Sequence, residues 1–150
     1  MTIQFLPSLQ LRILQRAMNL LKEDGRIVYS TCSLNPVENE AVVAAALKSN
    51  SGLSFPSNLP KRANLWLDFQ LVDVSSSFPE LKRRPGLTVW KPTDRRFTTF
   101  YTTYEEYLKA NASDEKAASK MSPSLWPPSD VDSLNLTRWC GLRCTDLSIC

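Results

Sequence analysis

The stretch 25-GRIVYSTCSLNPVENEAVVAAALK-48 decides how the chain is expected to fold. Its apolar run IVY is β-branched and aromatic and is bounded by turn residues, which predicts a buried parallel strand over 26–33. Asn35 suits an N-cap, Pro36 suits the first helical position and Glu38 completes a capping-box pattern, so a helix is predicted to begin there. The ENEAVVAAALK that follows is strongly helix-forming.

A second helix is predicted directly before this stretch. Residues 8–23 repeat apolar side chains with the 3.6-residue period of an amphipathic helix, and Gly25 offers a left-handed C-cap at low steric cost. Helix, strand and helix at this spacing form an α/β unit. The apolar positions are Leu9, Ile13, Ala17, Leu20 and Leu21, with Leu14 and Met18 beside them.

The second half of the chain gives weaker patterns. Alternation of side-chain types predicts a strand over 69–74 and a shorter one over 87–90, and a helix is expected from Thr103. Residues 111–124 are small and polar and are expected to be mobile, whereas 130–138 favours a short helix.

Composition excludes several classes of site. The 150 residues suffice for one domain, but the chain has no histidine, which excludes a Ser-His-Asp triad and any histidine-ligated metal. Four scattered glycines exclude the G-x-G-x-x-G and P-loop phosphate motifs. No apolar run reaches the ~18–20 residues of a membrane span and no signal peptide is evident, so no membrane partner is expected.

The four cysteines form one lone thiol, Cys32, and a terminal group of Cys140, Cys144 and Cys150. This is not the spaced framework of a disulfide-rich secreted domain, which favours a reducing, intracellular compartment. Structural zinc usually takes four ligands, and the terminal group offers three thiols. We therefore expect an unstructured tail rather than a zinc site, and no metal ligands in the chain.

Cys32 is the candidate for chemistry. It ends the predicted strand shortly before a helix N-terminus, and ligands of open α/β sheets bind at the carboxyl ends of strands. The positive end of a helix dipole favours a thiolate. The alternative is structural, because a lone cysteine in an apolar strand is usually a small buried hydrophobe. Position alone favours the structural alternative.

The string STCSLNPVENEAVV over 30–43, with LQLRIL over 9–14, resembles the Sun-type RNA cytosine-5 methyltransferases. The stretches LVDVSSSFPELKRRPGLTVWK (71–91) and LWPPSD (125–130) resemble their eukaryotic tRNA-modifying branch. The resemblance implies that Cys32 is the catalytic nucleophile, that S-adenosylmethionine is the methyl donor and that tRNA or another RNA is the partner. It also implies a nuclear or nucleolar protein. Asn35 and Glu38 are expected to cap the helix behind Cys32 rather than to touch substrate.

The resemblance further implies an incomplete domain. The expected fold is α/β, namely the C-terminal part of a Rossmann-like S-adenosylmethionine-dependent methyltransferase fold that lacks the early strands and the last strand. Residues 1–100 would be the C-terminal half of the catalytic domain, 101–138 a family-like insert and turn region that is partly mobile, and 139–150 a divergent tail. The cofactor-binding residues would lie in an upstream half, none of them in this chain, and that half could complement it.

A basic surface is the candidate RNA contact. The segment 55–100 has eight Lys or Arg against four acids, although the net charge of the chain is only +3. Phosphate contacts beside aromatic stacking are typical of RNA binding, whereas the alternative is a solvated loop over core aromatics. The basic residues are Lys82, Arg83, Arg84, Lys91, Arg95 and Arg96, and the aromatic ones are Trp90, Phe97, Phe100 and Tyr101.

These observations leave three hypotheses. The chain is the catalytic-cysteine part of an RNA cytosine-5 methyltransferase that is inactive alone, a non-catalytic RNA-binding or regulatory fragment, or a truncated product without function.

Overall fold

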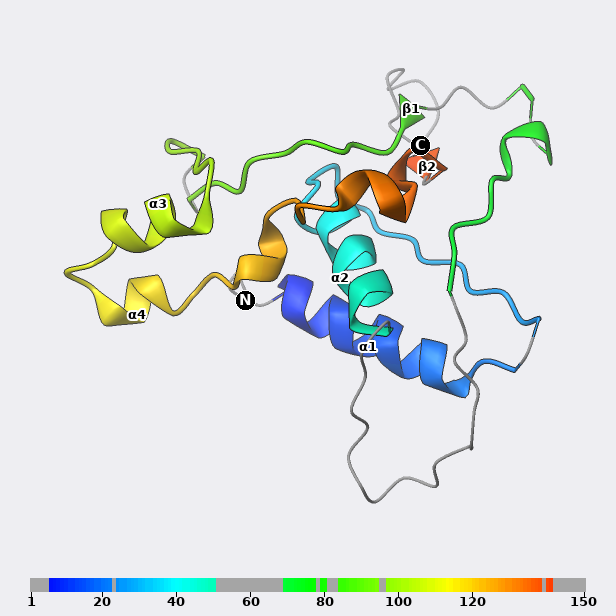
Figure 1. Ribbon diagram of the computed structural model, residues 1–150, viewed down its shortest axis with the longest axis horizontal. Coiled ribbons are helices and arrows are strands. Elements are labelled where there is room, and N and C mark those ends of the chain that lie inside the picture. Colours follow the sequence, from blue (N-terminus) through cyan, green and yellow to red (C-terminus); the bar gives the residue numbers. More distant parts are fainter. Residues whose placement is uncertain are drawn as a thin grey trace.

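The computed structural model describes residues 6–22, 24–50, 69–77, 79–80, 84–94, 97–138 and 140–141. Helices α1 (Leu6–Leu20) and α2 (Glu40–Asn50) lie side by side in the middle of the molecule, and α3 (Tyr104–Ala110) and α4 (Glu115–Ala118) form one end of it (Figure 1). None of the described helices is long and apolar enough to cross a membrane.

One side of α1 packs on α2. Leu14 and Met18 of α1 are buried against Val42 and Ala46 of α2, and the Gln15 amide donates to Ser49 Oγ over 2.8 Å. Burying each large apolar side chain stabilises the fold by about 1.5–3 kcal/mol. The α1 helix predicted from periodicity is therefore confirmed.

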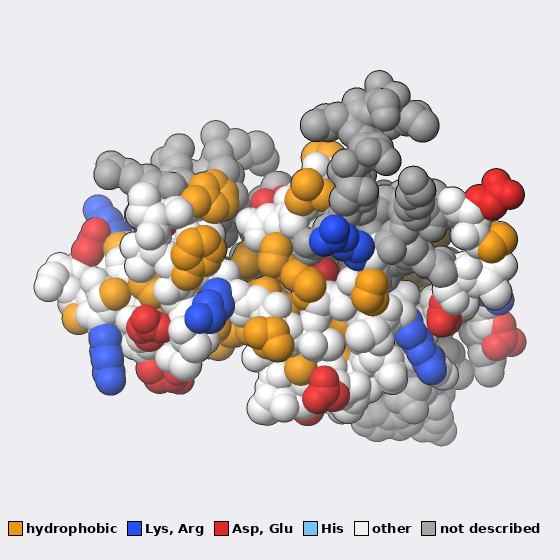
Figure 2. Space-filling view, turned by 90° about the horizontal axis from the view of Figure 1, so that it is seen from above, with side chains coloured by type: hydrophobic (Ala, Val, Ile, Leu, Met, Phe, Trp, Pro, Cys, Tyr) orange, Lys and Arg blue, Asp and Glu red, His pale blue; other side chains and the backbone are white. Residues whose placement is uncertain are grey.

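The opposite side of α1 is also apolar but remains exposed. Leu9, Ile13 and Leu20, all predicted apolar positions, are 43%, 61% and 68% exposed. Apolar side chains also reach the surface at several places on the face of the molecule that is seen from above (Figure 2). The predicted pattern combined two faces, and only the one with Leu14 and Met18 found a neighbour among the described residues.

The predicted strands over 26–33, 69–74 and 87–90 are wrong for the described structure. Its only ladder is antiparallel and joins β1 (Arg84–Pro85) to β2 (Cys140–Gly141), with one isolated bridge elsewhere. A strand needs a neighbour to receive its hydrogen bonds, and no described segment pairs with 26–33. The alternation survives, because Ile27 and Tyr29 pack on the α1–α2 core while Val28 is 91% exposed.

The turn after α1 also differs from its prediction. Asp24, with φ of 61°, is the left-handed residue, and Gly25 has no positive φ. A Cβ at Gly25 would lie 2.7 Å from the Leu21 side chain and 2.9 Å from the Lys22 carbonyl oxygen. Glycine is therefore required there for close approach rather than for its backbone conformation.

Aromatic side chains build a second core around α3. The predicted start at Thr103 is confirmed, because the Thr103 hydroxyl accepts the N–H of Glu106 over 3.1 Å as N-cap. The Tyr107 ring meets that of Tyr101 edge to face at 5.1 Å, and its hydroxyl donates to the Ala117 carbonyl. Residues 111–124, expected to be mobile, thus contain helix α4. The buried members of this core are Tyr101, Tyr107, Met121, Leu125 and Trp126.

Trp90 connects helix α2 to the aromatic core around α3. It is buried with Ala44 of α2 and with the fully buried Leu136, and its indole N–H donates to the Leu125 carbonyl over 2.8 Å. Leu136 begins the 3-10 helix η5 (Leu136–Arg138), which follows η4 (Val131–Leu134) and η3 (Pro123–Leu125). The short helix predicted over 130–138 is therefore present as two 3-10 turns.

Candidate functional site

Cys32 lies at a bend between residues 25–31, which have no regular secondary structure, and the turn that leads into α2. Its thiol is free and exposed. The structural alternative for this residue, a small buried hydrophobe in a strand, is therefore wrong. A solvent-accessible thiol on a short turn can reach a substrate atom that approaches from outside the molecule.

Hydrogen bonds hold the chain on both sides of Cys32. The Thr31 hydroxyl donates to Asn39 Oδ1 over 2.5 Å, and Asn39 Nδ2 donates to the Ser33 carbonyl over 2.8 Å. The Ser33 N–H also donates to Thr31 Oγ1 over 3.3 Å. One side chain from the turn before α2 therefore fixes both neighbours of the thiol. Sequence reasoning did not select Asn39, although the second Asn of the N-P-V-E-N string was a signal for it.

The start of α2 lies later than predicted. Asn35 Oδ1 accepts the N–H of Val37 over 3.1 Å, so Asn35 does cap the turn. The Asn35 N–H donates to Ser33 Oγ over 3.1 Å, which leaves no capping box with Glu38. Residues 36–39 form a turn, closed by a bond from the Ala41 N–H to the Pro36 carbonyl, before the helix begins at Glu40.

Two buried residues, Glu38 in this turn and Glu40 at the start of α2, connect the region to the rest of the fold. The Glu38 carbonyl accepts the Tyr29 hydroxyl over 2.7 Å, and burial, aided by the Glu38 charge, raises the pKa of Tyr29 to about 12. The Glu40 carboxylate accepts the N–H of Leu87 over 3.0 Å. The segment that holds Trp90 is thereby anchored to the first residue of α2.

Only some residues of the candidate RNA surface are exposed. Trp90 and Tyr101 are buried core residues, so the RNA-facing interpretation is wrong for them, whereas Phe97 and Phe100 are each 59% exposed. Arg84 and Lys91 are exposed, as both the RNA-facing surface and the solvated loop require. The remaining four basic residues, Lys82, Arg83, Arg95 and Arg96, lie outside the described part of the chain, as do the side chains of Cys140, Cys144 and Cys150.

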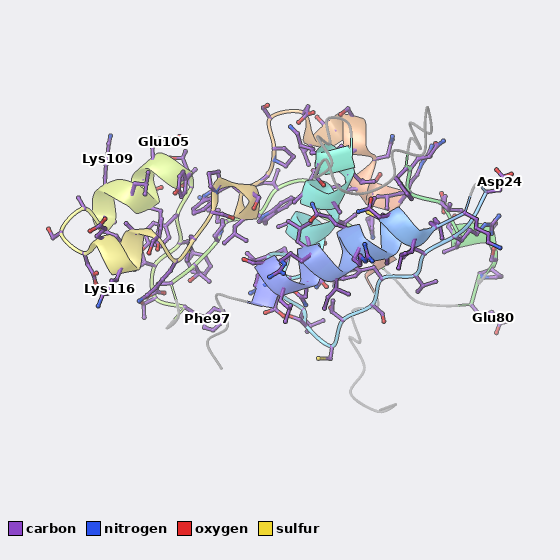
Figure 3. The ribbon with its side chains drawn as sticks, turned by 90° about the horizontal axis from the view of Figure 1, so that it is seen from below. Asp24, Glu80, Phe97, Glu105, Lys109 and Lys116 are labelled. Carbon is purple, nitrogen blue, oxygen red and sulfur yellow. The ribbon has the colours of Figure 1, made fainter. Side chains whose placement is uncertain are left out.

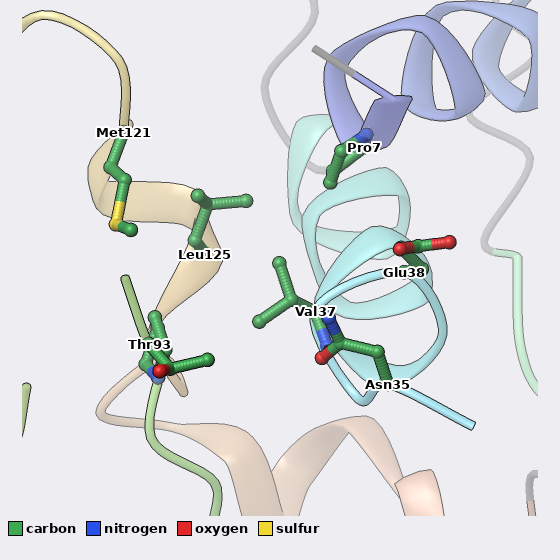
Figure 4. Close-up of a pocket in the computed structure, with 8 residues that line it drawn as sticks. Pro7, Asn35, Val37, Glu38, Thr93, Met121 and Leu125 are labelled. Carbon is green, nitrogen blue, oxygen red and sulfur yellow. The ribbon is translucent and has the colours of Figure 1, made fainter. Parts of the chain in front are cut away.

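A shallow pocket opens beside the turn that follows Cys32. It lies between the start of α1, the turn before α2, and the segments around Thr93 and Leu125 (Figure 4). Its lining is mostly apolar, and Figure 4 shows the Glu38 carboxylate pointing away from Met121 and Leu125. S-adenosylmethionine carries a ribose diol and a charged amino-acid end, which this donor set does not fit. The lining residues are Pro7, Asn35, Val37, Glu38, Pro92, Thr93, Met121 and Leu125.

Metal binding has no support in the described part either. Those residues contain no group of three or more His, Cys, Asp or Glu side chains placed to hold an ion. Within the described residues, the candidate site is therefore an exposed thiol on a hydrogen-bonded turn.

The known proteins named below, to which the chain is similar, are all RNA methyltransferases. The family described as 16S rRNA methyltransferase RsmB/F matches residues 1–103. The multisite-specific tRNA:(cytosine-C(5))-methyltransferase trm4b of Schizosaccharomyces pombe is 44% identical over 119 residues, which is 79% of this chain and 14% of that protein. The tRNA (cytosine(34)-C(5))-methyltransferase of Drosophila melanogaster is 38% identical over 101 residues, 67% of this chain and 12% of that protein.

The Saccharomyces cerevisiae multisite-specific tRNA:(cytosine-C(5))-methyltransferase is 44% identical over 94 residues, 62% of this chain and 11% of that protein. The chain thus spans only 11–14% of the length of these relatives. No solved structure gives a significant match.

The family implies the Rossmann-like fold of S-adenosylmethionine-dependent methyltransferases, which agrees with the predicted fold class at that level. Almost all of the regular secondary structure in the described residues is helical. The family match over 1–103 includes the whole braced turn around Cys32, and it confirms the resemblance carried by the T-C-S-L-N-P string. The chain belongs to the 16S rRNA methyltransferase RsmB/F family.

Proposed function

We propose that this chain carries the catalytic-cysteine part of a tRNA (cytosine-5)-methyltransferase, with Cys32 as the nucleophile. The observation that carries the proposal is the exposed Cys32 thiol on a turn braced by Asn39, within the string that marks the family. The three relatives above are named as tRNA cytosine-C5 methyltransferases, which supports tRNA as the substrate. The nucleus as the site of action is proposed from the family resemblance of the sequence alone.

The chemistry requires a thiol. Carbon 5 of cytosine is a poor nucleophile, and addition of the Cys32 thiolate to carbon 6 opens the 5,6 double bond and places its electron pair on carbon 5. S-adenosylmethionine supplies the methyl group that carbon 5 accepts. Loss of the carbon 5 proton then restores the double bond and expels the thiolate, so that one difficult step is divided into two.

An exposed thiol on a turn can reach a cytosine that is not stacked or paired within a duplex. Carbon 6 cannot be reached by a thiol while the cytosine is paired within a duplex, so the target is expected to be flipped out or in a loop. The residues that hold S-adenosylmethionine are proposed to lie in an upstream half outside this chain, since the described pocket does not suit that molecule. The isolated chain is therefore proposed to be inactive.

The experiment is trapping with tRNA that contains 5-fluorocytosine, in which the fluorine cannot leave as a proton does and the adduct persists. The 150-residue chain is incubated with this tRNA and S-adenosylmethionine, with and without the upstream half of the fission yeast relative's domain. We expect a covalent protein–tRNA adduct only with that half present. Cys32→Ala should abolish it, whereas Cys140→Ala, the matched control, should not.

The other outcomes distinguish the hypotheses. An adduct formed by the chain alone would contradict the proposal that the cofactor site lies upstream. An adduct that survives Cys32→Ala would contradict Cys32 as nucleophile. Retention of tRNA without any adduct would favour a non-catalytic RNA-binding or regulatory fragment, and the absence of both binding and adduct would favour a product without function.

A further inference from the structure

Residues 92–94 and 99–101 form a short antiparallel ribbon. Thr93 bridges to Phe100, the Tyr101 N–H donates to the Pro92 carbonyl over 2.9 Å, and the Asp94 N–H donates to the Thr99 carbonyl over 3.1 Å. These contacts share one register, so the rule that side chains alternate between the two faces applies to the ribbon.

The alternation gives this ribbon an inner and an outer face. Pro92 and Tyr101 oppose each other and are both buried, so they define the inner face. Phe100, one residue from Tyr101, is 59% exposed on the outer face. Lys91 precedes Pro92 by one residue and is exposed, which places it on the same outer face as Phe100.

The tip of the ribbon presents a second exposed ring. Phe97 is 59% exposed and has φ of 58°, a left-handed conformation that a bulky side chain rarely adopts. Its N–H donates to the Asp94 carbonyl over 3.1 Å. Figure 3 shows Phe97 projecting outward from the ribbon. The ring is thus held away from the core by a conformation that costs free energy.

The Asp94 carboxylate holds the tip in this conformation. It accepts the N–H groups of Thr98 and Thr99 over 2.7 and 3.1 Å, and the Thr98 hydroxyl over 2.7 Å. Four hydrogen bonds to Asp94, including that from the Phe97 N–H, hold residues 97–99 in place before any ligand arrives. Pre-ordering lowers the entropy lost on binding.

Two exposed aromatic rings and an exposed lysine on this ribbon suit an unpaired nucleic acid strand. Nucleobases stack on exposed aromatic rings in a sequence-tolerant manner, and a nearby lysine attracts the phosphates. The segment 55–100 has eight Lys or Arg against four acids, Asp94 among them, so its net positive charge favours a polyanion.

We propose that Phe97 and Phe100 form a stacking platform for unpaired bases of the RNA substrate, and that Lys91 contacts the phosphate backbone beside them. This deepens the proposed function and rests on it for the identity of the polyanion.

The test compares two probes that differ only in their bases. Fluorescence anisotropy measures binding of the 150-residue chain to a short labelled oligocytidine RNA and to an abasic ribose-phosphate strand of equal length. Phe97→Ala and Phe100→Ala should each weaken binding to the oligocytidine about fivefold or more, as expected for the loss of one stacked base. Neither should change binding to the abasic strand by more than about twofold. Lys91→Gln should weaken binding to the oligocytidine and to the abasic strand by the same factor.

Controls keep this test independent of folding. Val89→Ala removes another exposed apolar side chain, 75% exposed in the adjoining segment, and should bind both probes as the wild type does. Phe100→Trp should retain affinity for the oligocytidine. Phe97→Gly should lose that affinity while relieving the left-handed strain, so that weaker binding cannot be assigned to unfolding.

Two results would overturn the platform: unchanged oligocytidine binding in both phenylalanine variants, or equal losses on the abasic strand. Because this assay contains no S-adenosylmethionine and measures no adduct, its failure is distinguishable from the failure of Cys32 in trapping. Stacking without any trapped adduct would leave the platform standing and overturn only the catalytic proposal.

Discussion

The Thr31 hydroxyl and the Asn39 side-chain oxygen lie 2.5 Å apart, and the same Asn39 amide donates to the Ser33 carbonyl. Thr31 and Ser33 flank Cys32, so a single side chain before α2 positions the thiol. The string around Cys32 therefore contains both the proposed nucleophile and the residue that orients it.

Asn39→Ala should slow the trapping of 5-fluorocytosine tRNA more than it weakens tRNA binding. The substitution removes two hydrogen bonds, each worth about 0.5–1.5 kcal/mol, and frees the turn around Cys32. Trapping kinetics in the presence of the upstream half, with Cys32 intact, and a separate tRNA-binding assay measure the two effects, and urea unfolding measures any loss of stability. Asn39→Asp, which keeps the acceptor for Thr31 and loses the donor to Ser33, should give an intermediate rate. Equal rates in all three proteins would show that Asn39 does not position the thiol.

Trp90→Phe should destabilise the chain although it keeps an aromatic ring in the core. The Leu125 carbonyl would lose its 2.8 Å indole donor, and a buried unsatisfied polar group costs about 1–3 kcal/mol. Loss of ring volume adds to this cost. Urea unfolding measures the change, with Val89→Ala as the exposed neighbour that should stay within about 0.5 kcal/mol of the wild type. A change in the free energy of unfolding as small as this for Trp90→Phe would show that the hydrogen bond from Trp90 to Leu125 does not stabilise the fold.

Stability should fall in acid partly through Asp94. Hydrogen bonds to its carboxylate, first that from the Thr98 hydroxyl, hold the pKa of Asp94 below its ordinary value of 3.8. Because the folded-state pKa is the lower one, the contribution is present above pH 3.8 and is lost as the pH falls through the folded-state value. Thermal unfolding followed from neutral pH into this range should show a weaker acid dependence in Asp94→Asn.

Asp130 provides a matched comparison for this titration. The hydrogen bond from Lys48 lowers the pKa of Asp130 as well, in a separate exposed pair. Asp130→Asn should remove its own part of the acid dependence and add to the effect of Asp94→Asn, since the two sites share no partner. An Asp94→Asn chain with the full wild-type acid dependence would argue against the hydrogen-bonded loop.

The exposed side of α1 should promote self-association. Leu9, Ile13 and Leu20 form an apolar stripe opposite the buried Leu14 and Met18. Ile13→Lys should reduce light scattering at high protein concentration and change the free energy of unfolding by less than about 0.5 kcal/mol. Leu14→Ala, on the packed side, should cost about 2–5 kcal/mol. A large loss of stability in Ile13→Lys would show that this stripe is buried in solution.

Local features were predictable wherever neighbours in the sequence supply the whole interaction. The periodicity of α1 and the helix start at Thr103 depend on residues a few positions apart, and both are present. Asn35 caps a turn, but the helix predicted to begin there begins at Glu40. The strands over 26–33, 69–74 and 87–90 were not predictable in this way, because a strand exists only beside a partner. Ile27, Val28 and Tyr29 keep their alternation without a ladder.

The same distinction between local and long-range interactions holds for the candidate site. The sequence by itself determined the thiol at Cys32, the family string around it and the excess of basic residues over 55–100, since these are matters of residue identity and order. Only the tertiary structure decided which aromatic residues are free to meet a ligand. Trp90 and Tyr101 face the core while Phe97 and Phe100 face solvent, because burial depends on contacts between segments that lie far apart in the chain.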